Sequence, residues 1–130
     1  MNQKAALSQY RNINTQLAIE QASSHRLVQM LMEGALQRMA EARGAMQRKA
    51  TAEKGEAIGK AISIIGGLRD SLKHEVKSDL PQKMDNLYVY ITMRLLDANR
   101  QNDAASLDEL IHLMKTLKEG WDGIGSQANH

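Results

Sequence analysis

Residues 84–100 constrain this chain most, because they have a helical pattern and are apolar on two sides. At about 100° per residue, one stripe is suited to a core: Met84, Leu87, Tyr88, Ile91, Leu95 and Ala98. A second set falls on the other side: Val89, Tyr90, Met93 and Leu96. In a small domain, such a helix is either central or keeps a second face for another molecule. We take the second set as the main indication of function.

The composition describes one domain without unusual chemistry. Its 130 residues are enough for a core of their own, and the lack of cysteine excludes disulfides, thiolate zinc sites and cysteine nucleophiles. The 17 basic and 15 acidic residues alternate along polar faces, and the one basic cluster, at Arg43, Arg48 and Lys49, is typical of a solvated helix end. We therefore expect no nucleic-acid partner. The chain starts without a signal sequence and has no run of roughly 20 apolar residues, so we expect a cytoplasmic protein without membrane insertion.

Helical periodicity defines two segments in the first half of the chain. The first begins after the capping residue Ser23 and runs toward Lys49. The second follows a lapse at residues 50–55, and its single stripe consists of Ile58, Ala61, Ile62, Ile65, Leu68, Leu72 and Val76. Gly66 and Gly67 lie inside it. Since each glycine costs roughly 1 kcal/mol relative to alanine in a helix, we expect close helix packing there.

Two further helices follow. Pro81 suits the first turn of the third helix, which ends at the polar residues 99–103. Asp103 is placed to cap the fourth helix, whose apolar face is formed by Leu107, Leu110, Ile111, Met114, Leu117 and Trp121. We expect this helix to stop at residues 120–125. Short polar links and the lack of a strand signal predict an all-α fold, an antiparallel up-and-down four-helix bundle over residues 23–125 with a disordered tail at 126–130.

The first 22 residues differ from the bundle. Their apolar side chains are sparse and separated by Asn, Gln and Ser; they are Leu7, Tyr10, Ile13, Leu17 and Ile19. The composition predicts a flexible, loosely held N-terminal arm or short helix that folds only by docking on the bundle.

No group of residues is typical of an active site. Glu109 and His112 match one Glu-x-x-His motif of carboxylate-bridged metal bundles, but the spacing turns both toward water and no second copy exists. His25, His74 and His130 lie near helix ends or the terminus, without a visible catalytic partner. We expect no enzyme, no metal and no cofactor, and a metal-dependent bundle enzyme is the weaker alternative.

Apolar surface is the remaining source of function. The chain has eight methionines and no phenylalanine, so Met39, Met84 and Met114 are expected to fill the core. Met30 and Met93 lie off the main stripes, where flexible thioether side chains adapt to irregular partners. A groove between helices is suited to an amphipathic helix of another chain. Apolar surface beyond what a core needs is also expected in a helical-bundle adaptor that binds another amphipathic helix, or in a self-associating structural protein.

Several motifs together resemble the flagellar secretion chaperones that hold flagellin before export. They are Leu87-Tyr88-Val89-Tyr90, Arg94-Leu95-Leu96-Asp97-Ala98-Asn99 and Asp103, preceded by Tyr10, Ala22-Ser23, Leu27, Met30, Leu31, Gly34-Ala35, Gly55-Glu56-Ala57-Ile58 and Lys60-Ala61, and followed by Leu113, Leu117 and Trp121. The likeness covers residues 10–121 in the family's order. The chain departs from it at Ser24, where the family has proline, and at Met32, where the family has tyrosine.

The resemblance implies a bundle that binds the C-terminal segment of flagellin in the cytoplasm, in a one-to-one complex. It also implies that binding prevents premature polymerisation of an amphipathic client that is disordered as a monomer, and that a component of the flagellar type III export gate receives the complex. An anti-sigma factor is a further candidate partner. The residues expected to contact a partner are Leu7, Tyr10, Ile13, Leu27, Met30, Leu31, Gly34, Val89, Tyr90, Met93, Leu96 and Asn99.

Overall fold

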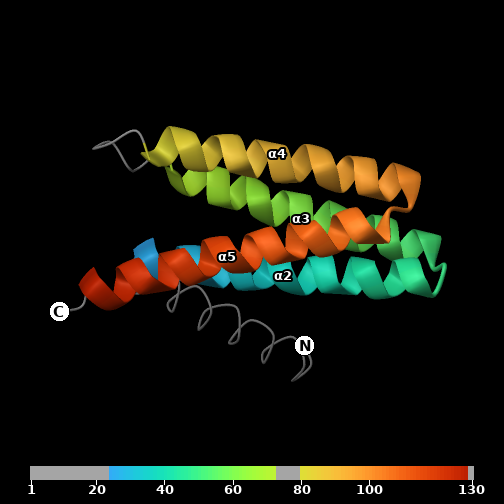
Figure 1. The fold of residues 1–130 in the computed structure, drawn as a ribbon, viewed down its shortest axis with the longest axis horizontal. Coiled ribbons are helices and arrows are strands. Elements are labelled where there is room, and N and C mark those ends of the chain that lie inside the picture. The colour runs from blue at the N-terminus through green and yellow to red at the C-terminus, as the bar shows by residue number, and fades with distance from the viewer. Residues whose placement is uncertain (1–23, 73–79, 129–130) are drawn as a thin grey trace, which may run out of the picture.

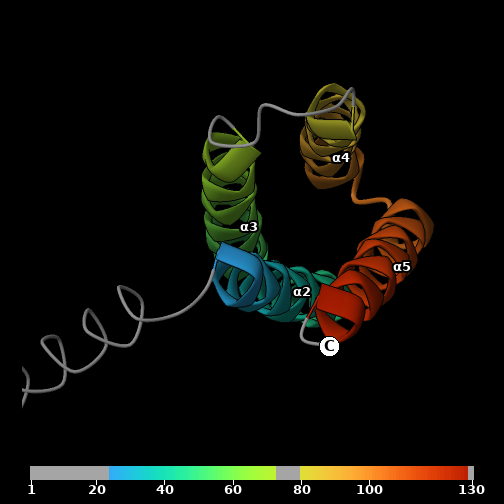
Figure 2. The ribbon, with the colours of Figure 1, turned by 90° about the vertical axis from the view of Figure 1, so that its left-hand side faces the viewer.

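The computed structural model describes residues 24–72 and 80–128, and this part of the chain consists of four α-helices without strands. They are α2 (Ser24–Gln47), α3 (Thr51–Ser71), α4 (Leu80–Gln101) and α5 (Ala104–Ala128). Consecutive helices run in opposite directions (Figure 1). Both α2 and α4 pack against α3 and α5, so α2 and α4 lie diagonally across the bundle (Figure 2). The predicted all-α four-helix bundle is confirmed.

The helix bounds agree with the sequence pattern except at two ends. α3 begins at Thr51, within residues 50–55, where the apolar periodicity lapses. Lys49 takes a left-handed backbone conformation (φ 58°), and the Ala50 amide donates to the Ala45 carbonyl at 2.9 Å. These two residues therefore complete the turn before α3. α5 does not stop at residues 120–125 but continues to Ala128, so that prediction was wrong. Glycine lowers helix propensity by only about 1 kcal/mol, so Gly120 and Gly123 do not by themselves end the helix.

The core follows the predicted stripes except at Leu87, which was expected in the core but is half-buried and lies outside the core cluster. Its buried side chains are Val28, Met32, Ala35, Met39, Ala42, Met46, Ala57, Ile58, Ala61, Ile65, Leu68, Tyr88, Ile91, Leu95, Leu107, Leu110 and Met114. Met39 and Met114 are fully buried, while Met84 is half-buried and packs against the cluster. Long, flexible thioethers therefore fill space that phenylalanine occupies in many cores.

Contacts between α2 and α5 join the two ends of the described chain. The His25 ring stacks on Trp121 with centroids 4.9 Å apart, and Trp121 Nε1 donates to the His25 carbonyl at 2.9 Å. Asp122 accepts hydrogen bonds from Lys118 (2.7 Å) and Gln29 (2.6 Å), which lower the pKa of its carboxyl. His25 is thus half-buried in an interhelical contact.

The turn between α4 and α5 holds their relative rotation. Asp103 accepts hydrogen bonds from the Ser106 amide (3.1 Å) and hydroxyl (2.7 Å), which confirms it as the cap of α5 and lowers the pKa of its carboxyl. Arg94 Nη2 of α4 donates to the same Ser106 hydroxyl at 3.0 Å. One serine therefore connects the α5 cap to the side of α4.

A buried lysine attaches α3 to the same turn. Lys54 Nζ donates to the Asn99 carbonyl at 3.0 Å and to Asn102 Oδ1 at 2.6 Å. Since the last carbonyls of a helix lack intrahelical partners, the ammonium group both satisfies one of them and offsets the negative end of the α4 dipole. Together with Arg94, Lys54 holds one side of α4 toward the core.

Candidate partner-binding surface

The exposed apolar side chains of the described residues gather on α4. Tyr90 is 50% exposed, Met93 61% and Leu96 52%, and the other large hydrophobic side chain exposed to this degree is Ile124 of α5. Val89 beside them is half-buried. We call Val89, Tyr90, Met93 and Leu96 the outer α4 face. It is the set that the two-sided pattern of residues 84–100 predicted to lie outside the core.

Helical spacing makes these four residues one continuous surface. Val89, Met93 and Leu96 recur at i, i+4 and i+7, and Tyr90 lies three positions before Met93. Side chains at these separations are neighbours on a helix surface. The outer α4 face is therefore a patch with Met93 at its centre.

The opposite side of α4 is sealed in the core. Tyr88, Ile91 and Leu95 are fully buried, and burial raises the pKa of the Tyr88 hydroxyl to about 12. The inner side of α4 supplies the side chains that pack in the core. Core packing therefore does not account for the apolar residues of the outer α4 face. In a monomer of this size a contiguous apolar patch marks a site of interaction.

Polar pairs bound the outer α4 face at both ends. Toward the start of α4, Gln82 Nε2 donates to Asn86 Oδ1 at 3.0 Å. Toward its end, Arg100 and Asp97 form an ion pair. Because these polar groups are paired with each other, the surface between them offers apolar contact. That chemistry fits the apolar side of an amphipathic segment rather than a small charged ligand.

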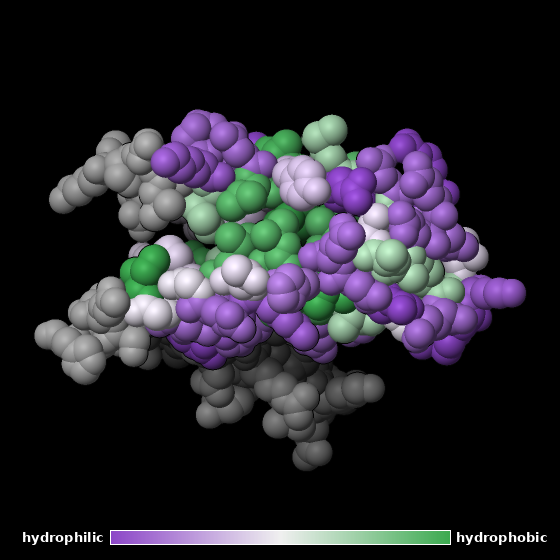
Figure 3. Space-filling view, viewed as in Figure 1, coloured by the Kyte–Doolittle hydropathy of each residue, from purple (hydrophilic) through white to green (hydrophobic). Residues whose placement is uncertain are grey.

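A second apolar region lies between α4 and α5, where Figure 3 shows hydrophobic side chains partly open to the surface. These two helices pack together less closely than α2 and α3. Half-buried side chains of α4 and α5 against the core are Met84, Ile111, Leu113, Leu117 and Trp121. Ile111, Leu117 and Trp121 were predicted to lie on the core face of the fourth helix, and the structure leaves them only partly covered.

Ile124 is an exposed residue that the sequence analysis missed. It lies seven positions after Leu117 on the same side of α5 and is 49% exposed. The expectation that α5 stops at residues 120–125 removed it from consideration. Its i+7 spacing was the available signal.

The candidate residues of α2 lie elsewhere on the bundle. An added Cβ at Gly34 would meet Ile64 Cδ1 of α3 at 3.4 Å, so Gly34 faces α3. Leu27, Met30 and Leu31 are half-buried, and Leu27 and Met30 precede Gly34 by seven and four positions on the same side of α2. These residues and the outer α4 face therefore belong to two helices that lie diagonally across the bundle (Figure 2).

The remaining candidate residues lie near the α4–α5 turn or outside the described residues. Asn99 is half-buried near the α4–α5 turn, where its carbonyl accepts the Lys54 hydrogen bond, and it is not part of the outer α4 face. Leu7, Tyr10 and Ile13, together with the arm over residues 1–22, lie outside the described residues.

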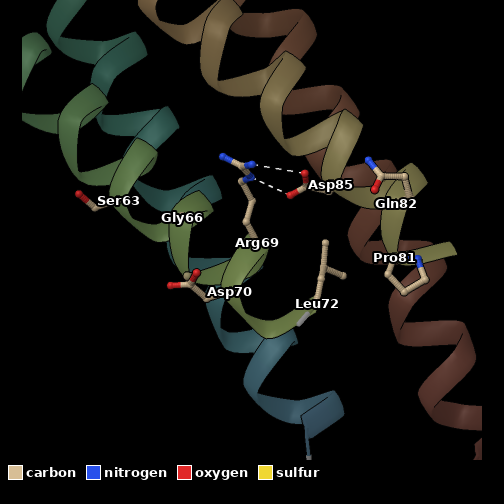
Figure 4. Close-up of a pocket in the computed structure, with 9 residues that line it drawn as sticks. Ser63, Gly66, Arg69, Asp70, Leu72, Pro81, Gln82 and Asp85 are labelled. Carbon is tan, nitrogen blue, oxygen red and sulfur yellow. Dashed lines mark hydrogen bonds and ion pairs between the residues drawn. The ribbon is translucent and has the colours of Figure 1, made fainter. Parts of the chain in front are cut away.

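A cleft of about 840 Å³ separates parts of α3 and α4, as Figure 4 shows. Arg69 and Asp85 pair across it, with Nε to Oδ1 at 2.7 Å and Nη2 to Oδ2 at 3.3 Å, and this pairing lowers the pKa of Asp85. Gly66 borders the cleft, and an added Cβ there would meet nothing within 4 Å. At Gly67 the nearest contact, with Leu31, would be an ordinary 3.6 Å. The expectation of close packing was therefore wrong at Gly66, which faces open space, and packing does not require glycine at Gly67.

The candidate metal ligands of α5 lie on the surface of the bundle. Glu109 and His112 are both exposed on α5, as their helical spacing predicted. Within the described residues, no three His, Asp or Glu side chains are grouped so as to hold a metal ion. No helix in the described part of the chain is long and apolar enough to cross a membrane.

Comparisons with known proteins identify the family of this chain. The family model described as Flagellar protein FliS matches residues 6–128. The chain is 48% identical over 119 residues to the flagellar secretion chaperone FliSB of Pseudomonas aeruginosa, covering 92% of this chain and 94% of the relative. It is 36% identical over 121 residues to the flagellar secretion chaperone FliS of Vibrio cholerae, covering 93% and 89%.

The fold defines an all-α four-helix bundle with exposed apolar side chains on α4. This chain belongs to the FliS family of flagellar secretion chaperones. The chain is also 33% identical over 126 residues to the flagellar secretion chaperone FliS of Salmonella typhimurium, covering 96% of this chain and 93% of the relative. The resemblance found in the sequence motifs is thereby confirmed at the level of the family.

Proposed function

We propose that this protein binds the C-terminal segment of flagellin in the cytoplasm, in a one-to-one complex, and prevents its premature polymerisation. The complex then delivers flagellin to the flagellar type III export apparatus through a component of the export gate. The observation that carries this proposal is the outer α4 face, an apolar patch that the core does not use. Membership of a flagellar secretion chaperone family supports the identity of the client.

Candidate residues on two diagonal helices favour a long client over a single docked helix. The outer α4 face belongs to α4, and Leu27 and Met30 belong to α2, which lies diagonally across the bundle from α4. A segment that is disordered when free can wrap a large surface and fold as it binds. The ordering cost then reduces the affinity per unit of buried area, which allows release at the export gate without a nucleotide.

A titration with a peptide from the flagellin C-terminus tests the proposal. We expect binding to be saturable at one peptide per chain, with a gain of helix in circular dichroism on mixing. The double variant Tyr90→Asp with Met93→Asp is expected to raise the Kd by at least about 10-fold, because two carboxylates would have to lose water in an apolar contact.

A matched variant controls for charge. Gln47→Asp with Thr116→Asp adds the same two carboxylates at exposed positions of α2 and α5, away from the outer α4 face and from the side of α2 that carries Leu27 and Met30. It should bind the peptide as the unaltered protein does. Equal binding by both double variants would refute the proposed role of the outer α4 face.

The same samples separate flagellin binding from self-association. Sedimentation of the free protein and of the mixture reports the masses of both species. A dimer of this chain that persists when the peptide is present, with no bound peptide, would favour a self-associating structural protein instead. An anti-sigma factor that shares the surface would compete with the peptide in the same titration.

A further inference from the structure

We propose that Met93 is a site of reversible oxidation, and that its conversion to the sulfoxide weakens client binding. This inference rests on the proposed function, because it assigns a consequence to the outer α4 face. It concerns the chemistry of one side chain that neither the family nor the fold accounts for.

Exposure distinguishes Met93 from the other methionines of the described residues. Met93 is 61% exposed, whereas Met32, Met39, Met46 and Met114 are buried, and Met30 and Met84 are half-buried. The chain has no cysteine, so thioether sulfur is the only sulfur that an oxidant meets. Susceptibility of sulfur to oxidants follows exposure. Met93 is therefore the preferred target within the described residues.

The position of Met93 makes its oxidation consequential. It follows Tyr90 by three positions and precedes Leu96 by three, so it lies between the two other most exposed side chains of α4. A client that covers this patch must cover the Met93 thioether. The buried methionines of the core are shielded from the same oxidant, so the fold survives conditions that alter the surface.

A hydroperoxide is the class of oxidant that the step requires. A lone pair of the Met93 sulfur attacks one peroxide oxygen, the O–O bond breaks, and the leaving oxygen takes a proton to form water or an alcohol. Sulfur is oxidised by two electrons and the peroxide is reduced by two. Methionine sulfoxide reductases, which take electrons from a thiol, return the sulfoxide to the thioether.

The sulfoxide changes the contact from apolar to polar. Its oxygen is a strong hydrogen-bond acceptor that water solvates in the free protein. Val89 and Leu96 offer it no donor, and the Tyr90 hydroxyl is the one donor of the outer α4 face. Burying a hydrated acceptor beneath an apolar client is unfavourable. We expect the Kd for the client to rise roughly 10-fold, a change that a reductase reverses.

The test oxidises the chaperone alone and then measures binding. The protein is treated with hydrogen peroxide, the oxidant is quenched with excess free methionine, and peptide mapping locates the sulfoxides. A flagellin C-terminal peptide without methionine is then titrated in. Met93 should carry the first sulfoxide among the described methionines, and the Kd should rise in proportion to its occupancy.

Two leucine variants assign the effect to the residue. Met93→Leu has no thioether at this position, so its Kd, whatever its starting value, should not change on peroxide treatment. Met84→Leu removes a half-buried methionine, and its Kd for the peptide should still rise on peroxide treatment. A peroxide effect of equal size in Met93→Leu would overturn the inference.

Protection by the client gives an independent readout. Bound peptide should slow sulfoxide formation at Met93 several-fold and leave the rate at Met84 less changed. If the unoxidised protein fails to bind the peptide, the proposed function is wrong. If it binds and the Met93 sulfoxide form binds equally well, or if oxidation spreads evenly over Met30, Met84 and Met93, this inference alone is wrong.

Discussion

The inner and outer sides of α4 use the same residue types for different purposes. Leu95 is fully buried, while its neighbour Leu96 is 52% exposed, and Tyr88 is buried while Tyr90 is half exposed. Side-chain chemistry alone does not separate the members of each pair. Their angular position on the helix does, and it assigns one leucine and one tyrosine to the fold and leaves the others for a partner.

The contacts at the end of α4 maintain this division. Lys54 holds the Asn99 carbonyl from the side of α3, and Arg94 holds Ser106 at the start of α5. Rotation of α4 by about one residue, 100°, would break both contacts and bury part of the outer α4 face. The polar groups near the turn therefore determine which apolar residues remain outside.

The adjacent leucines provide the sharpest test of the comparison. Leu95→Ala should lower the free energy of unfolding by about 2–5 kcal/mol, because it removes a fully buried side chain and leaves a cavity. Leu96→Ala should change it by less than about 0.5 kcal/mol, while weakening binding of the flagellin peptide. Urea unfolding and peptide titration of the two variants measure both effects. Equal losses of stability in the two variants would show that the two sides of α4 do not differ as described.

The buried tyrosine predicts a loss of stability at high pH. The folded pKa of Tyr88, about 12, exceeds its ordinary value of 10.0, so its contribution is complete below pH 10 and is lost as the pH rises through 12. At about 1.4 kcal/mol per pKa unit, this amounts to about 2–3 kcal/mol. Tyr88→Phe should remove that part of the alkaline slope in urea unfolding, whereas Tyr90→Phe should leave it in place. An unchanged slope in Tyr88→Phe would exclude Tyr88 as its cause.

The cap of α5 predicts a smaller effect at low pH. The pKa of Asp103 lies below its ordinary value, chiefly because the Ser106 hydroxyl donates to it, so its contribution is present above pH 4 and is lost as the pH falls through the folded pKa. Asp103→Ala should lower the urea midpoint at pH 7 by less than Leu95→Ala does, and the variant should lose less stability on acidification. A midpoint equal to that of the unaltered protein at pH 7 would mean that the cap does not stabilise α5.

The core residues and the outer α4 face could be predicted from the sequence because each depends on the angular position of a residue around its own helix. Period 3.6 separates Leu95 from Leu96 without any knowledge of the other helices. The cap at Asp103 was predictable for the same reason, since it involves residues three positions apart. Local periodicity therefore carries most of the information about which residues are buried.

Features that depend on contacts between helices could not be predicted in this way. The contact of Trp121 with His25 joins residues nearly a hundred positions apart in the sequence. Whether Gly66 faces a neighbour or a cleft depends on the separation of α3 and α4. The α2 residues Leu27 and Met30 and the outer α4 face were all predicted to contact a partner, but only the order of the helices around the bundle shows that α2 and α4 lie diagonally opposite each other.

Site-specific photocrosslinking tests the outer α4 face most directly. A photoreactive phenylalanine analogue at the position of Tyr90 is compared with the same analogue at Thr116, an exposed position on α5. With the flagellin C-terminal peptide bound, we predict a crosslink from position 90 that unlabelled peptide competes away, and none from position 116. A complex that forms with normal affinity but crosslinks only from position 116 would contradict the assignment of the outer α4 face as the client-binding surface.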